Sequence, residues 1–193
     1  MNEAAAGSLL DDLFRILGRS LEYPQGNWPD GDYLAWLDGL LAELGWEEER
    51  AELRDLPADH VELLDVLQIE YTRLFINAVP TAVAPPYGSV HYPGEGMLNN
   101  RSTEKTREFY RRHGFDLAEE SGPADYLPLE LEFLARLAGS GRETEAEVFL
   151  SNYFRPWFSA FRARVLAGAL LPFYRILIEL IDFFTQQEDK YEN

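Results

Sequence analysis

"YTRLFINAVPTAVAPPYGSVHY", from Tyr71 to Tyr92, lies near the middle of the 193-residue chain and carries the pattern that decides the fold class. It begins as the end of a helix, because Leu74 and Phe75 share a helical face with Tyr71. Three prolines then follow among apolar and aromatic residues: Pro80, Pro85 and Pro86. Residues 83–92 come nearest to a strand, but two of these prolines exclude a central strand there. The pattern favours an all-α fold.

Helical periodicity extends from this stretch toward the N-terminus. Ser8 is expected to cap a first helix with an apolar stripe of leucines and a phenylalanine. A second helix begins at about Asp30, and Gly45 stands where a C-cap belongs. Asp59 opens a third helix, which runs into the quoted stretch. The N-terminal helix group therefore covers about residues 8–75.

Helical periodicity also returns on the C-terminal side. Ser102 or Thr103 begins a helix, and another begins near Pro123–Asp125. Residues 143–187 are predicted to form two or three helices, which prolines divide. The C-terminal helix group therefore covers about residues 102–187.

Residues 76–101 join the two groups without a helical pattern of their own. Connections of this length inside compact domains are uncommon and are usually functional or disordered. This one is apolar and its prolines restrict the backbone beforehand, so we expect a rigid, packed connection. It either straps the two helix groups together or forms a binding surface. We expect residues 1–193 to make one helical domain, a bundle of two groups joined by this proline-rich loop.

The composition limits the environment and the partners of the chain. Lys and Arg number 17 against 34 Asp and Glu, which gives a net charge of −17 and disfavours binding to nucleic acid. Cysteine is absent, as suits a reducing compartment. The start, "MNEAAAGSLLDDLF", lacks the basic region of a signal peptide, and no apolar run reaches the ~18 residues of a membrane span. We expect a cytoplasmic protein without stable membrane insertion.

Residue patterns that carry chemistry are absent from the sequence. The histidines at positions 60, 91 and 113 have no metal-binding spacing and are expected at caps, loops or the surface. The aromatic run Tyr153–Phe161 has helical spacing and is expected in the core. No nucleophile, base and electrophile come together in any motif. We therefore expect a protein that is not an enzyme, with no catalytic residue, metal or cofactor.

Two pieces of sequence, Y-x-x-L-F at Tyr71–Phe75 and P-P-Y-G-S-V at Pro85–Val90, resemble motifs of the TorD/DmsD/NarJ family. These proteins are all-helical cytoplasmic chaperones for molybdenum-cofactor oxidoreductases. A Pro-Trp-Phe helix at Pro156–Phe158 and a late helix at Pro172–Leu180 agree with the family. The resemblance covers about Leu10 to Phe184 and implies a fold of the TorD-like type.

The resemblance also implies a peptide-binding site. The family has a Glu-Pro-Asp-His-like run at the start of a later helix, and the matching residues here are Pro123–Tyr126. Asp125 is kept, whereas Tyr126 stands where histidine is usual. Asp125 is expected either to face a cationic residue of the peptide or to cap the helix that begins there. The implied site residues are Tyr71, Leu74, Phe75, Pro85, Pro86, Tyr87, Gly88, Ser89, Asp125 and Tyr126.

For function, the resemblance implies a chaperone that binds the N-terminal leader, often a twin-arginine export signal, or the apo form of a molybdoenzyme catalytic subunit. It would hold this partner in the cytoplasm during cofactor insertion. An accessory subunit that stays in an oxidoreductase complex is the alternative, and a small hydrolase or nucleotide-binding enzyme is disfavoured because its motifs are absent. We expect a mainly monomeric protein with a minor domain-swapped dimer.

Overall fold

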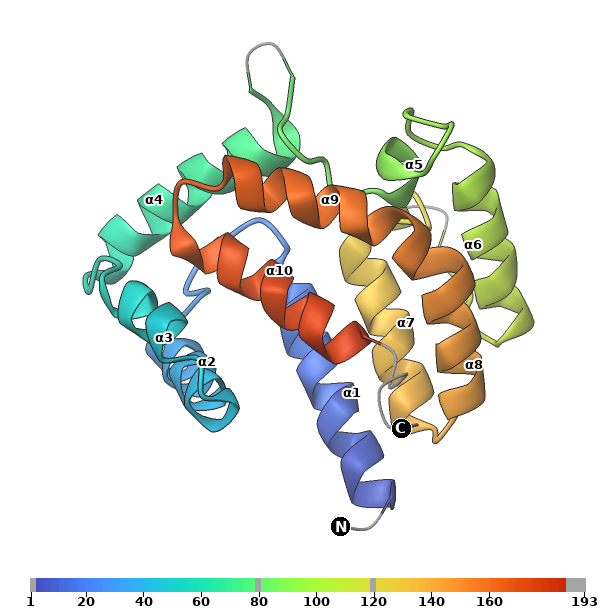
Figure 1. Ribbon diagram of the computed structural model, residues 1–193, viewed down its shortest axis with the longest axis horizontal. Helices are drawn as coiled ribbons and strands as arrows, with labels where there is room; N and C mark the ends of the chain where they lie inside the picture. Colours follow the sequence, from blue (N-terminus) through green and yellow to red (C-terminus); the bar gives the residue numbers. More distant parts are fainter. Residues whose placement is uncertain (1–2, 79–80, 119–120, 187–193) are drawn as a thin grey trace, which may run out of the picture.

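The computed structural model describes residues 3–78, 81–118 and 121–186, and the side chains from Leu9 onward (Figure 1). Within these residues the regular elements are all helices, which confirms the all-α fold. The first helices are α1 Glu3–Ser20, α2 Gly31–Leu44, α3 Glu47–Arg54, α4 His60–Tyr71 and α5 Gly88–His91. The later helices are α6 Arg101–Arg112, α7 Leu127–Gly139, α8 Glu143–Phe149, α9 Arg155–Gly168 and α10 Pro172–Thr185.

Three of the predicted caps of the N-terminal helices, Asp30, Gly45 and Asp59, are confirmed. The carboxylate of Asp30 accepts a hydrogen bond from Tyr33 N at 2.9 Å, which satisfies a free N–H at the start of α2. Gly45 ends the same helix with φ 73°, a left-handed conformation that glycine adopts without strain. Asp59 caps α4 by accepting from the amides of the second and third helical residues. Local sequence alone was enough to place these boundaries.

Other boundaries differ from the predictions. The first helix begins at Glu3 rather than at Ser8, and α6 begins at Arg101 behind an Asn100 cap. Helix α3 was missed because its sequence, EEERAELR, has no apolar stripe and buries only Leu53. It forms because its glutamates, arginines and alanine are good helix formers.

The connection 76–101 also differs, because it contains the short helix α5 and is therefore not free of helix. The chain enters it through a π-helical turn, Thr72–Ile76. Farther along, Ala84 N donates to Leu74 O at 2.8 Å, so the connection folds back on the helix it leaves. Pro80 and Gln187, on which parts of the predictions rest, lie outside the described residues.

Helices from both groups share one hydrophobic core. Helix α1 packs along α7, and Gly18 permits the approach, since a Cβ there would lie 3.3 Å from Pro128 O. Helices α9 and α10 cross in front of α1 and α7, with α2–α4 on one side and α6 and α8 on the other (Figure 1). Most of the predicted aromatic run at the start of α9 is buried: Phe154, Trp157, Phe158 and Phe161 are at most 1% exposed, whereas Tyr153 is half-buried.

Candidate functional site

The structure brings the two motif segments together, although they are far apart in the sequence. Gly88 N donates to Asp125 O at 2.8 Å, and Ser89 N donates to Asp125 Oδ2 at 2.5 Å. Leu127 N completes the junction by donating to Pro86 O at 3.0 Å. The free amides at the start of α5 are thus satisfied by the segment that leads into α7. We call this arrangement the motif junction.

Most of the predicted site residues are buried in the motif junction or beneath it. Tyr71 and Phe75 are each 4% exposed, and Leu74 and Ser89 are 0% exposed. Pro86 and Gly88 are buried as well. These side chains pack into the core and do not line an open groove. Their first role is therefore to hold the connection and α5 in place.

The position of Asp125 does not favour the expectation that it faces a cationic residue of a peptide, which stays a prediction. Asp125 is 1% exposed, and one carboxylate oxygen accepts the hydrogen bond from Ser89. The alternative, an N-cap of α7, is wrong, because α7 begins at Leu127 with Tyr126 at its cap position. Asp125 instead caps α5, which belongs to the other motif segment.

Of the remaining predicted residues, Pro85 is half-buried, and so are the tyrosines Tyr87 and Tyr126, which reach the surface. Their rings stack with centroids 5.1 Å apart and an interplanar angle of 28°. The Tyr126 hydroxyl lies 3.5 Å from the hydroxyl of Tyr71, which donates to Leu21 O at 3.0 Å. Tyr23 meets Tyr71 edge-on at 5.4 Å and is 41% exposed. We call Tyr23, Tyr87 and Tyr126 the tyrosine surface.

A cleft of about 440 Å³ adjoins the tyrosine surface at Tyr23. Ile69 lies in it with 70% of its surface exposed, and Asp65 contributes a carboxylate. Arg73 also lines the cleft, but its guanidinium is paired with the buried carboxylate of Glu70.

Burial raises the pKa of Tyr126, while its hydrogen bond with Tyr71 lowers it. Glu22, exposed and next to Tyr23 in the chain, is a second carboxylate beside this surface. The surface therefore combines aromatic and aliphatic side chains with the carboxylates of Asp65 and Glu22.

Sequence reasoning missed Tyr23, Asp65 and Ile69. The apolar stripe of α4 that faces the core includes Leu63, Leu67 and Tyr71. Ile69 lies outside this stripe, on the polar face of the helix. An apolar residue in such a position is the signal that would have indicated a binding surface.

Beneath the motif junction lies a second buried carboxylate, Glu130, which is 0% exposed. Burial raises its pKa well above the usual range, and the neighbouring charge of Asp125 acts in the same direction. His91 was expected at a cap, in a loop or at the surface; it is 7% exposed and is the last residue of α5, so the loop and the surface are wrong. Its Nε2 lies 2.7 Å from Pro85 O, and its ring stacks on Trp157.

In the described ranges, no three or more His, Asp and Glu side chains gather as a metal site would require. None of the helices described is long and apolar enough to cross a membrane. What this part of the chain offers is a stacked aromatic surface beside a cleft that Ile69 and several polar side chains line.

Comparisons with known proteins place the chain among similar sequences. The family model described as nitrate reductase delta subunit matches residues 37–163, which is more than half of the chain. A Tat proofreading chaperone DmsD from Salmonella paratyphi A is 34% identical over 113 residues, covering 57% of this chain and 54% of the relative. A chaperone protein TorD from Vibrio cholerae is 30% identical over 134 residues, covering 63% and 60%. The chain thus spans less than two thirds of these two relatives.

Two further matches extend over nearly the whole chain. A chaperone protein TorD from Actinobacillus succinogenes is 24% identical over 183 residues, covering 90% of this chain and 91% of the relative. A crystal structure of a protein from Archaeoglobus fulgidus, one assigned to redox enzyme maturation, superposes with a TM-score of 0.62. The two sequences are 26% identical, and the match covers 92% of this chain and 94% of the Archaeoglobus fulgidus chain.

Proposed function

Because this chain belongs to the nitrate reductase delta subunit family, we propose that it is a cytoplasmic chaperone for the maturation of a partner molybdoenzyme. The resemblance to the TorD/DmsD/NarJ family found in the sequence is confirmed. The proposed partner is the apo form of a catalytic subunit, recognised through its N-terminal leader of twin-arginine type. The chaperone holds this partner until the cofactor is inserted and does no chemistry itself.

The observation that carries the proposal is the tyrosine surface with its adjoining cleft. A twin-arginine leader joins basic residues to an apolar run. Tyr87 and Tyr126 offer two stacked rings for apolar or guanidinium groups, and Ile69 offers an aliphatic contact in the cleft. Asp65 and Glu22 supply the negative charge that Asp125, being buried, does not. The surface thus matches both parts of a leader.

Rigidity of the motif junction supports the same proposal. Tyr87 and Tyr126 come from two segments that main-chain hydrogen bonds tie together on both sides of the stack. A surface that is already in place loses little conformational entropy when a peptide binds. Burying one Leu or Phe of a leader on it is worth ~1.5–3 kcal/mol. Two or three such contacts give about 3–9 kcal/mol, so charge pairs and main-chain contacts of the leader must supply the rest of the free energy of binding after the cost of association.

The alternative role, an accessory subunit of an oxidoreductase complex, makes a different prediction in one experiment. The chain is affinity-tagged in its own host, and proteins that co-purify are identified before and after the client acquires its cofactor. A chaperone is expected with the cofactor-free client and is expected to be missing from the mature enzyme. Stoichiometric recovery with the mature enzyme would assign the chain to the complex instead.

A further inference from the structure

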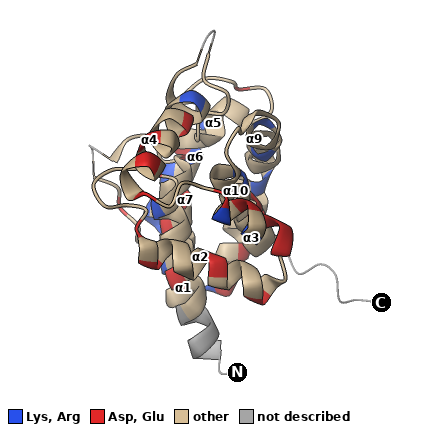
Figure 2. Cartoon of the chain, turned by 90° about the vertical axis from the view of Figure 1, so that its left-hand side faces the viewer, with Lys and Arg blue, Asp and Glu red and all other residues tan. Residues whose placement is uncertain are grey.

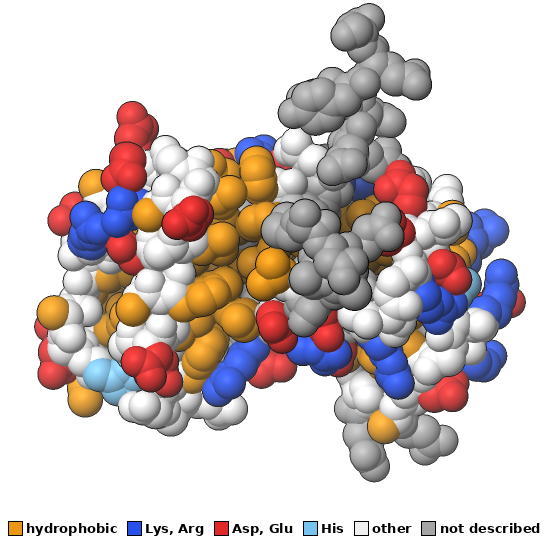
Figure 3. Space-filling view, turned by 90° about the horizontal axis from the view of Figure 1, so that it is seen from below, with side chains coloured by type: hydrophobic (Ala, Val, Ile, Leu, Met, Phe, Trp, Pro, Cys, Tyr) orange, Lys and Arg blue, Asp and Glu red, His pale blue; other side chains and the backbone are white. Residues whose placement is uncertain are grey.

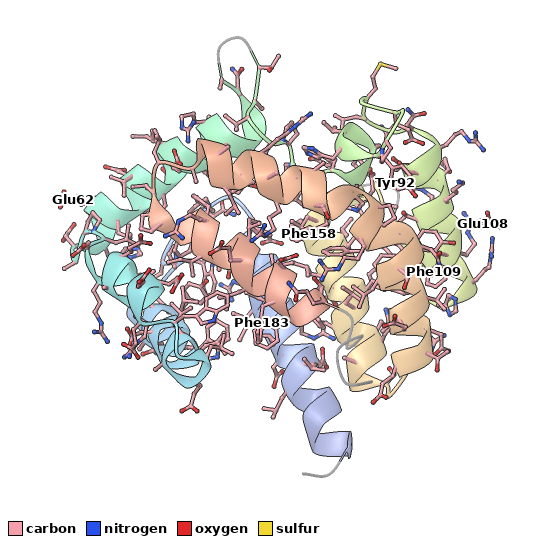
Figure 4. All side chains as sticks on the ribbon, viewed as in Figure 1. Glu62, Tyr92, Glu108, Phe109, Phe158 and Phe183 are labelled. Atoms are coloured by element: carbon pink, nitrogen blue, oxygen red, sulfur yellow. The ribbon has the colours of Figure 1, made fainter. Side chains whose placement is uncertain are left out.

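A second cleft, of about 530 Å³, lies between the α2–α3 corner and the end of α10. Trp46 and Phe183 form its aromatic part, with ring centroids 5.7 Å apart and an interplanar angle of 81°. Phe183 is 46% exposed, which is unusual for so large an apolar side chain, and Figure 4 shows it on α10. None of its lining residues is shared with the tyrosine surface or the cleft beside it.

Apolar surface continues beside this cleft. Seen from below, hydrophobic side chains fill a hollow between the α2–α3 side of the molecule and α1 (Figure 3). Helix α2 buries Leu37 and Leu41, and its next face carries half-buried Trp36, Leu40 and Leu44 at helical spacing. Trp36 lines a further cleft, of about 360 Å³, together with Ile16 of α1. The space between α1 and α2 is thus only partly filled.

Carboxylates surround the aromatic cleft. Its lining includes five acidic residues and one arginine: Glu47, Glu48, Glu49, Glu179, Asp182 and Arg162. Arg162 is already paired with Glu179 at 3.5 Å and with Asp182 at 3.3 Å. In the described part of the chain, neither Glu48 nor Glu49 takes part in a salt bridge. Figure 2 shows acidic residues around α2 and α3, and this end of the molecule therefore attracts cations.

We propose that this cleft is a second docking surface, which binds a basic amphipathic segment of a partner protein. An aliphatic or aromatic side chain of that segment packs between Trp46 and Phe183, and its Lys or Arg residues meet Glu48 and Glu49. Volume supports this, because about 530 Å³ holds a few side chains but not a folded element. A chaperone with two such surfaces can hold two separate segments of one client.

The negative charge around the cleft indicates which kind of molecule binds there. A second copy of this chain carries a net charge of −17, so its approach to an acidic cleft is opposed by repulsion. The chain's own last residues, 187–193, read QEDKYEN, with three acidic residues against one lysine. The last residues offer no basic segment, and the basic helix of a second copy, α6, already buries its apolar face in its own core. A foreign cationic segment is the occupant that complements both the aromatic pair and the carboxylates.

Titration with a labelled amphipathic peptide of arginine and leucine tests the proposal, beside a control peptide with glutamate in place of arginine. The variant E48K/E49K is compared with E62K/E143K, which changes the net charge equally at exposed positions outside the cleft. We expect E48K/E49K to weaken binding about tenfold or more and the control pair to change it only slightly. Equal effects of the two pairs, or equal binding of the two peptides, would overturn the proposal.

Photo-crosslinking locates the bound peptide on the protein without relying on a measurement of binding affinity. Benzoylphenylalanine is introduced at Phe183 in one protein and at Tyr87 in another. Crosslinks to the basic peptide from the Phe183 position support the second surface. Crosslinks only from the Tyr87 position overturn it while leaving the leader-binding proposal intact. Crosslinks from the Phe183 position to a second copy of the chain would identify a dimer interface and also overturn it.

Discussion

The main-chain N–H of Ser89 donates to the carboxylate of Asp125, with 2.5 Å between Ser89 N and Asp125 Oδ2. Both residues are essentially buried, at 0% and 1% exposed. One hydrogen bond thus joins the P-P-Y-G-S-V segment to the segment that leads into α7. Because the acceptor is charged, this bond is stronger than one between neutral groups. It fixes the two segments that carry the stacked rings of Tyr87 and Tyr126.

Replacing Asp125 is therefore expected to act on stability first. Asp125→Ala leaves the buried N–H of Ser89 without an acceptor, which costs about 1–3 kcal/mol of unfolding free energy. Asp125→Asn keeps an acceptor and is expected to cost less. Chemical denaturation of both variants measures the two values. The salt dependence of leader binding should stay unchanged in Asp125→Asn, and a flatter dependence would show that the carboxylate meets the peptide after all.

Tyr87→Ala is expected to weaken leader binding about tenfold, since one ring of the stack and its contact area are lost. The thermal midpoint should fall only slightly, because Tyr87 is half-buried. Titration calorimetry with a twin-arginine leader peptide measures the change. Tyr153→Ala is a matched control, because Tyr153 is half-buried and stacks on Phe149 in another part of the molecule. A large loss of stability with unchanged affinity would assign Tyr87 to packing alone.

The stability of the Glu130→Gln variant is expected to increase relative to that of the wild-type protein as the pH rises. Burial raises the pKa of Glu130 above its usual 4.5, so the folded protein keeps a proton that the unfolded chain releases. The folded state therefore loses stability as the pH rises from about 4.5 toward the raised pKa, by ~1.4 kcal/mol for each pH unit in that interval. Glutamine does not titrate and escapes this loss.

Thermal unfolding of wild type and Glu130→Gln between pH 4 and pH 8 measures this difference. Glu132→Gln, on the exposed side of the same helix, is the control, since its side chain is 41% exposed. A constant difference in Tm between wild type and Glu130→Gln across the series would show that Glu130 is not protonated in the fold.

Gly88→Ala is expected to destabilise the motif junction. A Cβ at Gly88 would lie 3.0 Å from Trp157 Nε1 and 3.1 Å from the adjacent ring carbon. Trp157 is 1% exposed and cannot move aside freely, so overpacking should cost about 1–3 kcal/mol. Denaturant unfolding checks the value, with Gly39→Ala as the control because a Cβ there meets nothing within 4 Å. Equal stability of the two variants would contradict the tight packing of α5 on α9.

The connection 76–101 is expected to allow a minor, slowly exchanging domain-swapped dimer beside a main monomer. Swapping requires α1 to leave α7 and the motif junction to open, so exchange needs partial unfolding. Size-exclusion chromatography with light scattering, repeated after each peak is isolated, measures the populations and the rate. Rapid re-equilibration would indicate an ordinary surface dimer in place of a swap.

The sequence by itself determined the all-α fold and the local boundaries whose causes lie within a few residues. Asp30, Gly45 and Asp59 act on amides or carbonyls of the helix they adjoin, so their effect can be read from their positions. The aromatic run in α9 was predicted to be core for a similar reason, because the period of 3.6 residues puts it on a buried face. Family membership also followed from motifs that are continuous in the sequence.

Only the tertiary structure decided which motif residues are buried and which reach the surface. Asp125 was expected to face a cationic residue of the peptide or to cap its own helix, yet it caps α5 from a distant segment. Burial of Asp125 and the half-exposure of Tyr126, its neighbour, depend on how α5, α7 and α9 pack. A charged side chain is stable in the core only where a hydrogen-bond donor contacts it. Here the donor is the main-chain N–H of Ser89, which is far from Asp125 in the sequence. No local pattern reports such a partner, because the contact exists only after the helices have come together.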